Sequence, residues 1–218
     1  GIIDKPNVVE FIYKKFDKSK LSTLPRAQFG GKIVVINGDA DAKKAVDYLM
    51  RQTRVGIDTE TRPSFRKGEM HGVALLQVAT YKECFLFRLN RIGVPDCVAS
   101  LLESEDVCKV GLSLTDDFIM LRHRRKNLAP KNVVELQKLA PTVGIEDMSL
   151  QKLYANLLGG YISKRQQLTN WETDSLTQAQ QLYASTDAWA CLQLEDEIEK
   201  LKSTGDYELI EENDQHIS

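Results

Sequence analysis

The chain contains few of the residues that bind transition metals or form disulfides. Its 218 residues include only four cysteines and three histidines, and no two cysteines have the C-x-x-C spacing of a zinc site. We therefore expect no zinc centre, and we interpret the cysteines as reduced thiols of an intracellular protein: Cys84, Cys97, Cys108 and Cys191. If the protein holds a metal ion, its ligands are expected to be oxygen atoms.

The sequence also lacks long apolar runs and an excess of positive charge. No stretch approaches the roughly 18 apolar residues of a membrane span, and no signal peptide is visible, so we expect a cytoplasmic protein with no membrane partner. The formal net charge is −2, which gives no overall indication of nucleic-acid binding. Basic clusters at residues 65–67, 122–126 and 163–165 are each explained at least as well as solvated surface.

Patterns typical of strands and helices alternate along the chain, as in an α/β protein. Apolar, β-branched runs predict strands over residues 32–37, 54–60, 72–80, 83–89, 107–113 and 132–136. Apolar residues at helical spacing predict helices over residues 39–52, 115–124, 149–158 and 177–202. The short connection around Tyr81 predicts a hairpin, so we expect an antiparallel meander in the middle of the sheet.

The two ends of the chain are expected to lie outside the central domain, which we place at residues 25–204. Residues 1–24 carry a helix-like stretch over residues 7–16 and are interpreted as an N-terminal helical extension. Thr177 and Gln180 match a capping box that opens the long final helix, and Gly205 is expected to end it. Residues 205–218 are acidic and polar and are predicted to form a frayed C-terminal tail.

The placement of three acidic residues raises a question about function. Asp58 and Glu60 are two apart in a predicted strand, so their side chains share one face and repel each other. On its own, this pair is explained by a strand end that reaches solvent. Asp187 lies four residues after Tyr183, on the same face of a largely apolar helix. A buried aspartate needs a hydrogen-bond partner or a metal.

Two further acids, Asp116 and Asp117, fall in the first turn of the helix predicted over residues 115–124. Acidic residues are common there because they complement the helix dipole. Together with the other acids, however, they suggest that divalent cations turn mutual repulsion into coordination. Ligation by oxygen alone suits Mg²⁺ or Mn²⁺. Two such ions about 3.5–4 Å apart can activate water and stabilise the leaving oxygen of a phosphodiester.

On these residues the chain resembles the DEDD 3′–5′ exonucleases, and within them the tyrosine-bearing (DEDDy) subgroup that includes the Werner syndrome helicase exonuclease domain and ribonuclease D. The matching segments are VGIDTE, GVALLQVAT, KVGLSLTDDFIML and LTNWETDSLTQAQQLYASTDAWACLQL, in the family's order. Asp58 and Glu60 match the first motif, Asp117 the second, and Tyr183 and Asp187 the third. The resemblance implies a ribonuclease H-like mixed sheet flanked by helices, with the exonuclease domain at residues 25–204.

The resemblance also implies a two-metal-ion mechanism that releases nucleoside 5′-monophosphates from the 3′ end of DNA or RNA. In it, Asp58, Glu60 and Asp187 hold the metal that carries the attacking water. Asp58 bridges to a second metal, which Asp117 helps to hold. Tyr183 hydrogen-bonds the water, and with an ordinary pKa of about 10 it orients the water rather than deprotonating it.

Candidate substrate contacts are spread over two segments. Thr59 lies between the metal ligands, where its backbone could meet the terminal nucleotide. Arg62 and Arg66, with Lys67 beside them, follow the first motif, and Lys164 precedes the third, so these cations are candidates for contacts with phosphates of single-stranded or recessed 3′ ends. Trp171 could stack on a base, although packing in the core is the commoner role of a tryptophan.

Two other functions fit the same residues. One is an exonuclease fold that binds nucleic acid or a protein without hydrolysis, and the other is a different two-metal nuclease, such as an oligoribonucleotide trimmer or an endonuclease. A glycosidase is a poor fit because carboxylates two apart on one strand cannot flank a sugar ring. Thr61 stands where a Werner-like domain has an aromatic residue, which weakens any transfer of that domain's contacts near the terminal base.

Overall fold

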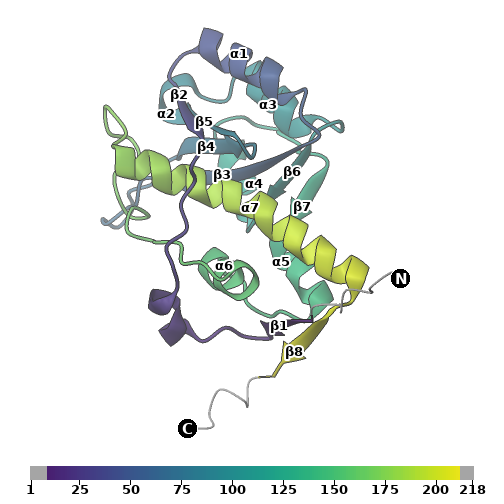
Figure 1. The fold of residues 1–218 in the computed structure, drawn as a ribbon. Coiled ribbons are helices and arrows are strands. Elements are labelled where there is room, and N and C mark those ends of the chain that lie inside the picture. The colour runs from purple at the N-terminus through teal and green to yellow at the C-terminus, as the bar shows by residue number, and fades with distance from the viewer. Residues whose placement is uncertain (1–8, 212–218) are drawn as a thin grey trace.

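The computed structural model describes residues 9–211 and contains a mixed six-stranded sheet with helices on both faces (Figure 1). Its strand order is β2-β5-β4-β3-β6-β7. The pairs β3–β4 and β4–β5 are antiparallel, and the pairs β2–β5, β3–β6 and β6–β7 are parallel. The predicted α/β class and central meander are therefore confirmed. The strands are β2 (Lys32–Ile36), β3 (Arg54–Thr61), β4 (Val73–Ala79), β5 (Glu83–Arg88), β6 (Cys108–Gly111) and β7 (Val133–Glu135).

The helices that were predicted from apolar spacing are present, together with shorter ones that were not predicted. The predicted helices are α1 (Asp39–Leu49), α4 (Leu114–Arg122), α6 (Leu150–Leu158) and α7 (Gln178–Thr204). The others are α2 (Leu89–Ile92), α3 (Asp96–Glu103), α5 (Leu136–Leu139) and the 3₁₀ helices η1 (Lys18–Thr23) and η2 (Ala140–Val143). One or two turns of helix give too short an apolar repeat to be recognised in a sequence.

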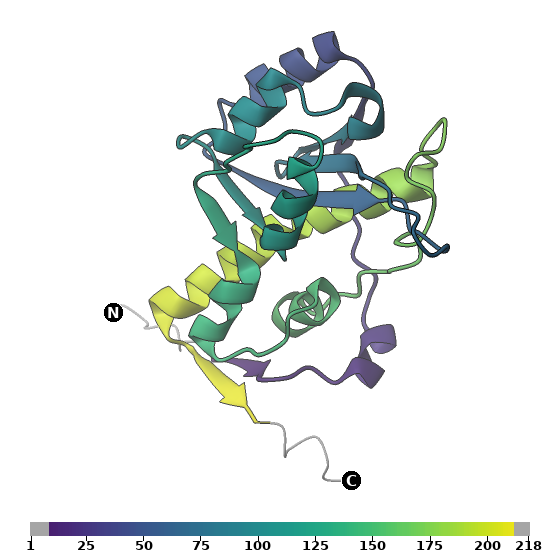
Figure 2. The same ribbon diagram turned by 180° about the vertical axis from the view of Figure 1, so that it is seen from behind.

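Helix α7 crosses one face of the sheet, and its C-terminal part extends past the sheet towards β1 and β8 (Figures 1 and 2). The predicted capping box is confirmed, since Thr177 accepts a hydrogen bond from the Gln180 amide and the Gln180 side chain accepts one from the Thr177 amide. At the other end, Gly205 adopts a left-handed conformation with φ of 67°. Both ends of the helix are thus specified locally.

Gly56 sets how closely α7 approaches the sheet. A Cβ atom at this position would lie 2.0 Å from the carbonyl oxygen of Ala188 on α7. On the opposite face, α1, α3 and α4 enclose a core that includes Val55 and Ile57 of β3. Strand β3 therefore lies between two hydrophobic layers, and only its C-terminal end can present polar groups to a cavity.

The predicted helix over residues 7–16 is wrong in its described part. Residues 10–13 form strand β1 (Glu10–Tyr13), which pairs in parallel with β8 (Tyr207–Ile210). Phe11 is exposed whereas Ile12 is buried, an alternation that suits a strand. The predicted frayed tail is wrong over β8 for the same reason, because pairing with a distant segment orders both. The remainder, residues 1–8 and 212–218, lies outside the described residues, and the domain boundaries stay predictions.

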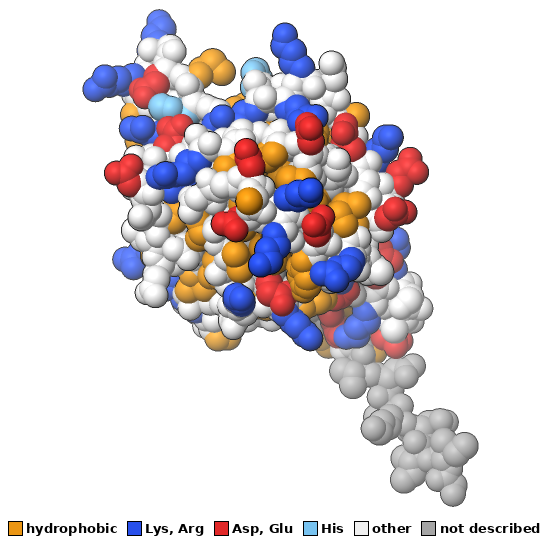
Figure 3. Space-filling view, turned by 90° about the horizontal axis from the view of Figure 1, so that it is seen from above, with side chains coloured by type: hydrophobic (Ala, Val, Ile, Leu, Met, Phe, Trp, Pro, Cys, Tyr) orange, Lys and Arg blue, Asp and Glu red, His pale blue; other side chains and the backbone are white. Residues whose placement is uncertain are grey.

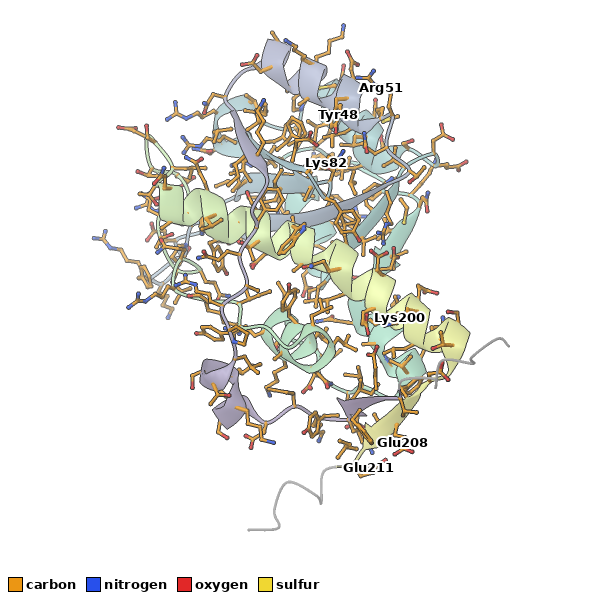
Figure 4. All side chains as sticks on the ribbon, viewed as in Figure 1. Tyr48, Arg51, Lys82, Lys200, Glu208 and Glu211 are labelled. Atoms are coloured by element: carbon orange, nitrogen blue, oxygen red, sulfur yellow. The ribbon has the colours of Figure 1, made fainter. Side chains whose placement is uncertain are left out.

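An ion pair ties the small β1–β8 sheet to α7. Lys200 of α7 lies next to these strands (Figure 4), and its Nζ is 2.7 Å from Oε1 of Glu10. Lys, Arg, Asp and Glu side chains are intermingled on the face of the molecule seen from above, so no single sign of charge covers that face (Figure 3). Among residues 9–211, no helix combines the length and the apolar character that a membrane span requires.

Candidate active site

Three acidic side chains converge where the C-terminal end of β3 meets the middle of α7. Asp58 and Glu60 come from β3 and Asp187 from α7, and one carboxylate oxygen from each lies within 4.8 Å of the other two. Glu60 and Asp187 are buried, and Asp58 is partly buried. The strand alternation predicted for Asp58 and Glu60 is thus confirmed, and the close approach of α7 at Gly56 brings Asp187 to them.

Asp117 is the fourth acid, and it reaches the same cavity of about 280 Å³ from the first turn of α4. Its Oδ1 accepts a hydrogen bond from the Thr59 hydroxyl at 2.9 Å. The neighbouring Asp116 is exposed and does not line the cavity. Of the two adjacent aspartates, Asp117 is therefore the one placed with the cluster.

The turn before α4 aims Asp117 into the cavity. Ser113, the residue before the helix, has a left-handed φ of 60°, which is uncommon for a residue with a side chain. The amide of Leu114 donates to Oε1 of Glu135 on β7 at 3.0 Å. This side chain from a neighbouring strand satisfies an amide at the helix start and fixes its position.

Two oxygen atoms in this cluster have no hydrogen-bond partner. Within residues 9–211, Oδ2 of Asp117 and Oδ1 of Asp187 are both buried and unpaired. Leaving a buried acceptor unsatisfied costs about 1–3 kcal/mol each, and more when it is charged. Four convergent carboxylates with unpaired buried oxygens are a donor set that fits hard divalent cations.

The pKa values of these acids also reflect the cost of burying several carboxylates together. Burial, followed by the charges of Asp187 and Asp117, holds the pKa of Asp58 well above its usual range. The pKa of Glu60 is raised in the same way by burial and by Asp58. Burial also raises the pKa of Asp117 and of Asp187 to about 7. Without a counter-charge, the site therefore holds protons that these carboxylates would otherwise lose.

Tyr183 lines the cavity one helical turn before Asp187. Burial, and then the charges of Asp187 and Glu60, raise the pKa of its hydroxyl far above the usual value. A hydrogen bond from Tyr183 lowers the pKa of Asp187, as does the positive charge of Lys164, although burial outweighs both. Tyr183 is therefore protonated and can act as a hydrogen-bond donor in the cavity.

Trp171 packs in the core, which the sequence analysis gave as its commoner role, and the candidate contact with a base is not available to it. Its side chain is completely buried, its ring centroid lies 5.9 Å from that of Tyr183, and its Nε1 donates to the Gln167 carbonyl at 3.2 Å. No face of the ring is open to a base. Trp171 instead packs beneath Tyr183 and supports it.

The predicted cationic contacts lie at different distances from the carboxylates. Lys164 lines the cavity itself. Arg62 lines a neighbouring cavity and is 3.6 Å from Glu172, whereas Arg66 and Lys67 are exposed on the same loop. The hydroxyl of Thr59 donates a hydrogen bond to Asp117, so its observed contact is with one of the four acids. None of these contacts with substrate is tested, and they stay predictions.

Gln77 is a site residue that sequence reasoning missed. It lies opposite Asp58 on β4, is fully buried, and its Nε2 is 3.4 Å from Oε1 of Glu60 and 3.3 Å from the Ala184 carbonyl. Its hydrogen bond lowers the pKa of Glu60, against the effect of burial. A single amide in the otherwise apolar run of β4 was the signal available in the sequence.

Comparison with known proteins supplies the family. A sequence model described as 3′–5′ exonuclease matches residues 33–202, which include all four acids and Tyr183. The chain belongs to the 3′–5′ exonuclease family. It is accordingly a hydrolase that removes nucleotides from 3′ ends, as the motifs predicted.

Individual members of the family agree with this assignment. The chain is 31% identical over 196 residues to a 3′–5′ exonuclease of Arabidopsis thaliana, covering 82% of this chain and 68% of that protein. It is also 31% identical to the mouse bifunctional 3′–5′ exonuclease/ATP-dependent helicase WRN, over 84% of this chain but 14% of the helicase. The exonuclease domain of Aedes aegypti Nibbler has the same fold, with a TM-score of 0.72 at 22% identity, over 86% of this chain and 91% of that one.

Proposed function

We propose that this exonuclease uses two divalent cations, Mg²⁺ or Mn²⁺, held by Asp58, Glu60, Asp117 and Asp187. The observation that carries the proposal is the convergence of these carboxylates with two buried oxygens that have no other partner. Asp58, Glu60 and Asp187 would hold one cation. Asp117 lies outside that group but lines the same cavity, and it would help to hold the second.

Bound cations would supply activation of water and stabilisation of the leaving oxygen in phosphodiester hydrolysis. The chain's own residues position the reactants. Thr59 holds one oxygen of Asp117, which leaves the other directed into the cavity. Tyr183 donates a hydrogen bond that orients the attacking water, as in the tyrosine subgroup, and Trp171 fixes the tyrosine ring. Lys164 lines the cavity and would bind a phosphate oxygen of the substrate.

The substrate is inferred to be a single-stranded or recessed 3′ end of DNA or RNA, and the product a nucleoside 5′-monophosphate. The carboxylate cluster repels the phosphate nearest the 3′ end until cations are bound, so cation binding is expected to precede placement of that phosphate at the cluster, while the rest of a strand can still bind outside it. The cytoplasmic location expected from the sequence stays a prediction.

The test uses 5′-labelled single-stranded DNA and RNA oligomers with Mg²⁺, Mn²⁺ or EDTA. We expect a ladder that shortens from the 3′ end, requires a cation, and disappears in Asp58→Ala. Asp117→Asn should lower the rate about a hundredfold, because the second cation would lose a charged ligand. Asp116→Asn is the matched control and should retain the wild-type rate, since Asp116 points away from the cavity.

Binding of oligomers without any ladder would instead support the non-catalytic alternative. Products cut internally would support an endonuclease. Equal losses in Asp116→Asn and Asp117→Asn would contradict the assignment of Asp117.

A further inference from the structure

Three exposed apolar side chains lie on the two segments that border the catalytic cavity. Phe65 and Met70 are on the β3–β4 loop (residues 62–72), and Leu168 is on the α6–α7 segment (residues 159–177). Their exposed fractions are 81%, 79% and 66%. One exposed apolar residue needs no explanation, but several large ones around one groove indicate a binding surface. Both ribbon views place these two segments at the same end of the molecule (Figures 1 and 2).

A continuous groove connects these side chains to the carboxylates. The catalytic cavity shares Glu60 and Gln167 with a neighbouring cavity of about 430 Å³, which also contains Met70. That cavity shares Arg62 and Leu168 with a third, of about 520 Å³. The third cavity is lined by Phe65 and Arg66. A chain that lies with one end at the carboxylates therefore has an open path to Phe65.

Glu69 lines the second and third cavities and is 2.9 Å from His71, whereas the cations beside Phe65 suit a polyanion. Arg66 and Lys67 follow Phe65 directly and are exposed. Within residues 9–211, neither has a carboxylate within ion-pair distance. Exposed cations beside an exposed aromatic ring are the combination that binds single-stranded nucleic acid, because the cations contact phosphates while bases stack on the ring.

Contacts between the two segments that form the groove fix its shape. Glu172 of the α6–α7 segment is 3.6 Å from Arg62 and 3.4 Å from His71 of the β3–β4 loop. His71 is also 2.9 Å from Glu69 on its own loop. Gly68 turns the tip of the loop with a left-handed φ of 84°. The apolar side chains are thus presented by a loop that is fixed at its base.

We propose that Phe65 and Leu168 form a stacking platform for an unpaired base upstream of the reacting 3′ end, with Arg66 and Lys67 binding the adjacent phosphates. The proposal rests on the exonuclease function proposed above and specifies its substrate as a single strand several nucleotides long. Such a platform is indifferent to base identity and to the sugar, because every base has a π-face. It replaces Trp171, which is buried, as the aromatic contact.

The test compares Phe65→Ala with Phe65→Tyr and with Phe11→Ala, a matched control for an exposed phenylalanine on the distant strand β1. Binding of a fluorescent single-stranded oligomer is measured by anisotropy in EDTA, where no hydrolysis occurs. Hydrolysis is then measured with Mn²⁺ on the same oligomer and on the p-nitrophenyl ester of thymidine 5′-monophosphate, which is too short to reach Phe65.

We expect Phe65→Ala to weaken oligomer binding and to lower kcat/KM on the oligomer by about tenfold, the typical loss of one stacked base. Phe65→Tyr and Phe11→Ala should behave like the wild type, and all variants should cleave the mononucleotide ester equally. Unchanged oligomer binding in Phe65→Ala would overturn the platform, and so would an equal loss on the short ester. If the wild type cleaves neither substrate, the proposed function fails, whereas the binding comparison still decides the platform.

Discussion

At the scale of single residues, the site is held together against its own electrostatics. Burial raises the pKa of every acid in the cluster, and the charges of the other acids raise those of Asp58 and Glu60 further. The side chains that counter this effect are Thr59, Gln77, Tyr183 and Lys164. Of these four side chains, Lys164 is the one that carries a positive charge. Such an arrangement is stable at neutral pH only if protons or metal cations neutralise it.

These raised pKa values predict a link between pH, metal and stability that Asp187→Asn weakens. The pKa of Asp187 is raised from 3.8 to about 7 in the fold, so the folded chain binds more protons than the unfolded chain between those values. In EDTA, stability should therefore fall as pH rises from about 4 to 7. Mg²⁺ or Mn²⁺ binds the ionised form and should raise Tm more at about pH 8 than at about pH 5.

Thermal unfolding of both proteins with and without metal is the measurement. Without metal at about pH 8, Asp187→Asn should melt roughly 5 °C higher than the wild type, because a buried repelling charge is gone. The Tm of Asp187→Asn should also rise less than that of the wild type when metal is added. An identical metal response in the two proteins would show that Asp187 is not a ligand.

At the scale of elements, the important contact is the one between β3 and α7. The two elements supply three of the four acids, and their separation is set at Gly56, one residue away from Ile57 and two from Asp58. A carbonyl oxygen of a helix cannot move by itself, so a side chain at residue 56 would displace the whole of α7. The position of Asp187 relative to Asp58 thus depends on a residue with no functional group.

Gly56→Ala should therefore reduce activity as well as stability. The added methyl group would meet the Ala188 carbonyl at 2.0 Å, and the strain should cost about 1–3 kcal/mol of unfolding free energy. Displacement of Asp187 by about 1 Å should lower kcat about a hundredfold. Gly30→Ala is the control, because a Cβ atom there meets nothing within 4 Å. Urea unfolding and the oligomer assay measure the two effects, and wild-type activity in Gly56→Ala would contradict this account.

At the scale of the whole molecule, segments near the two ends of the described chain pair with each other. Strand β1 pairs with β8, and Ile12 of β1 belongs to the same buried hydrophobic cluster as Ile198 and Leu201 at the C-terminal part of α7. These contacts join residues nearly two hundred positions apart. The strand pairing and this burial stabilise the C-terminal part of α7, which extends beyond the sheet.

Ile12→Ala tests this stabilisation. Deletion of a buried isoleucine side chain should lower the unfolding free energy by about 2–4 kcal/mol, while Phe11→Ala on the same strand should change it by less than about 0.5 kcal/mol. Chemical unfolding followed by circular dichroism distinguishes the two. Equal small effects would mean that the β1–β8 sheet contributes little to stability.

The sequence by itself determined the features that repeat locally. The two-residue period of a strand places Asp58 beside Glu60, and the four-residue spacing of a helix places Tyr183 beside Asp187. The capping box at Thr177 is likewise a contact between residues three apart. These features were predictable because the atoms concerned are neighbours in the chain.

Only the tertiary structure decided the features that depend on distant segments. The motif favoured Asp117 over Asp116, but Asp117 lines the cavity because Thr59 and Glu135, from other strands, position the start of α4. Trp171 is buried because α7 covers it, and residues 10–13 are a strand because β8 lies beside them. Burial, pKa and strand pairing are set by contacts across the whole chain, and no local pattern specifies them.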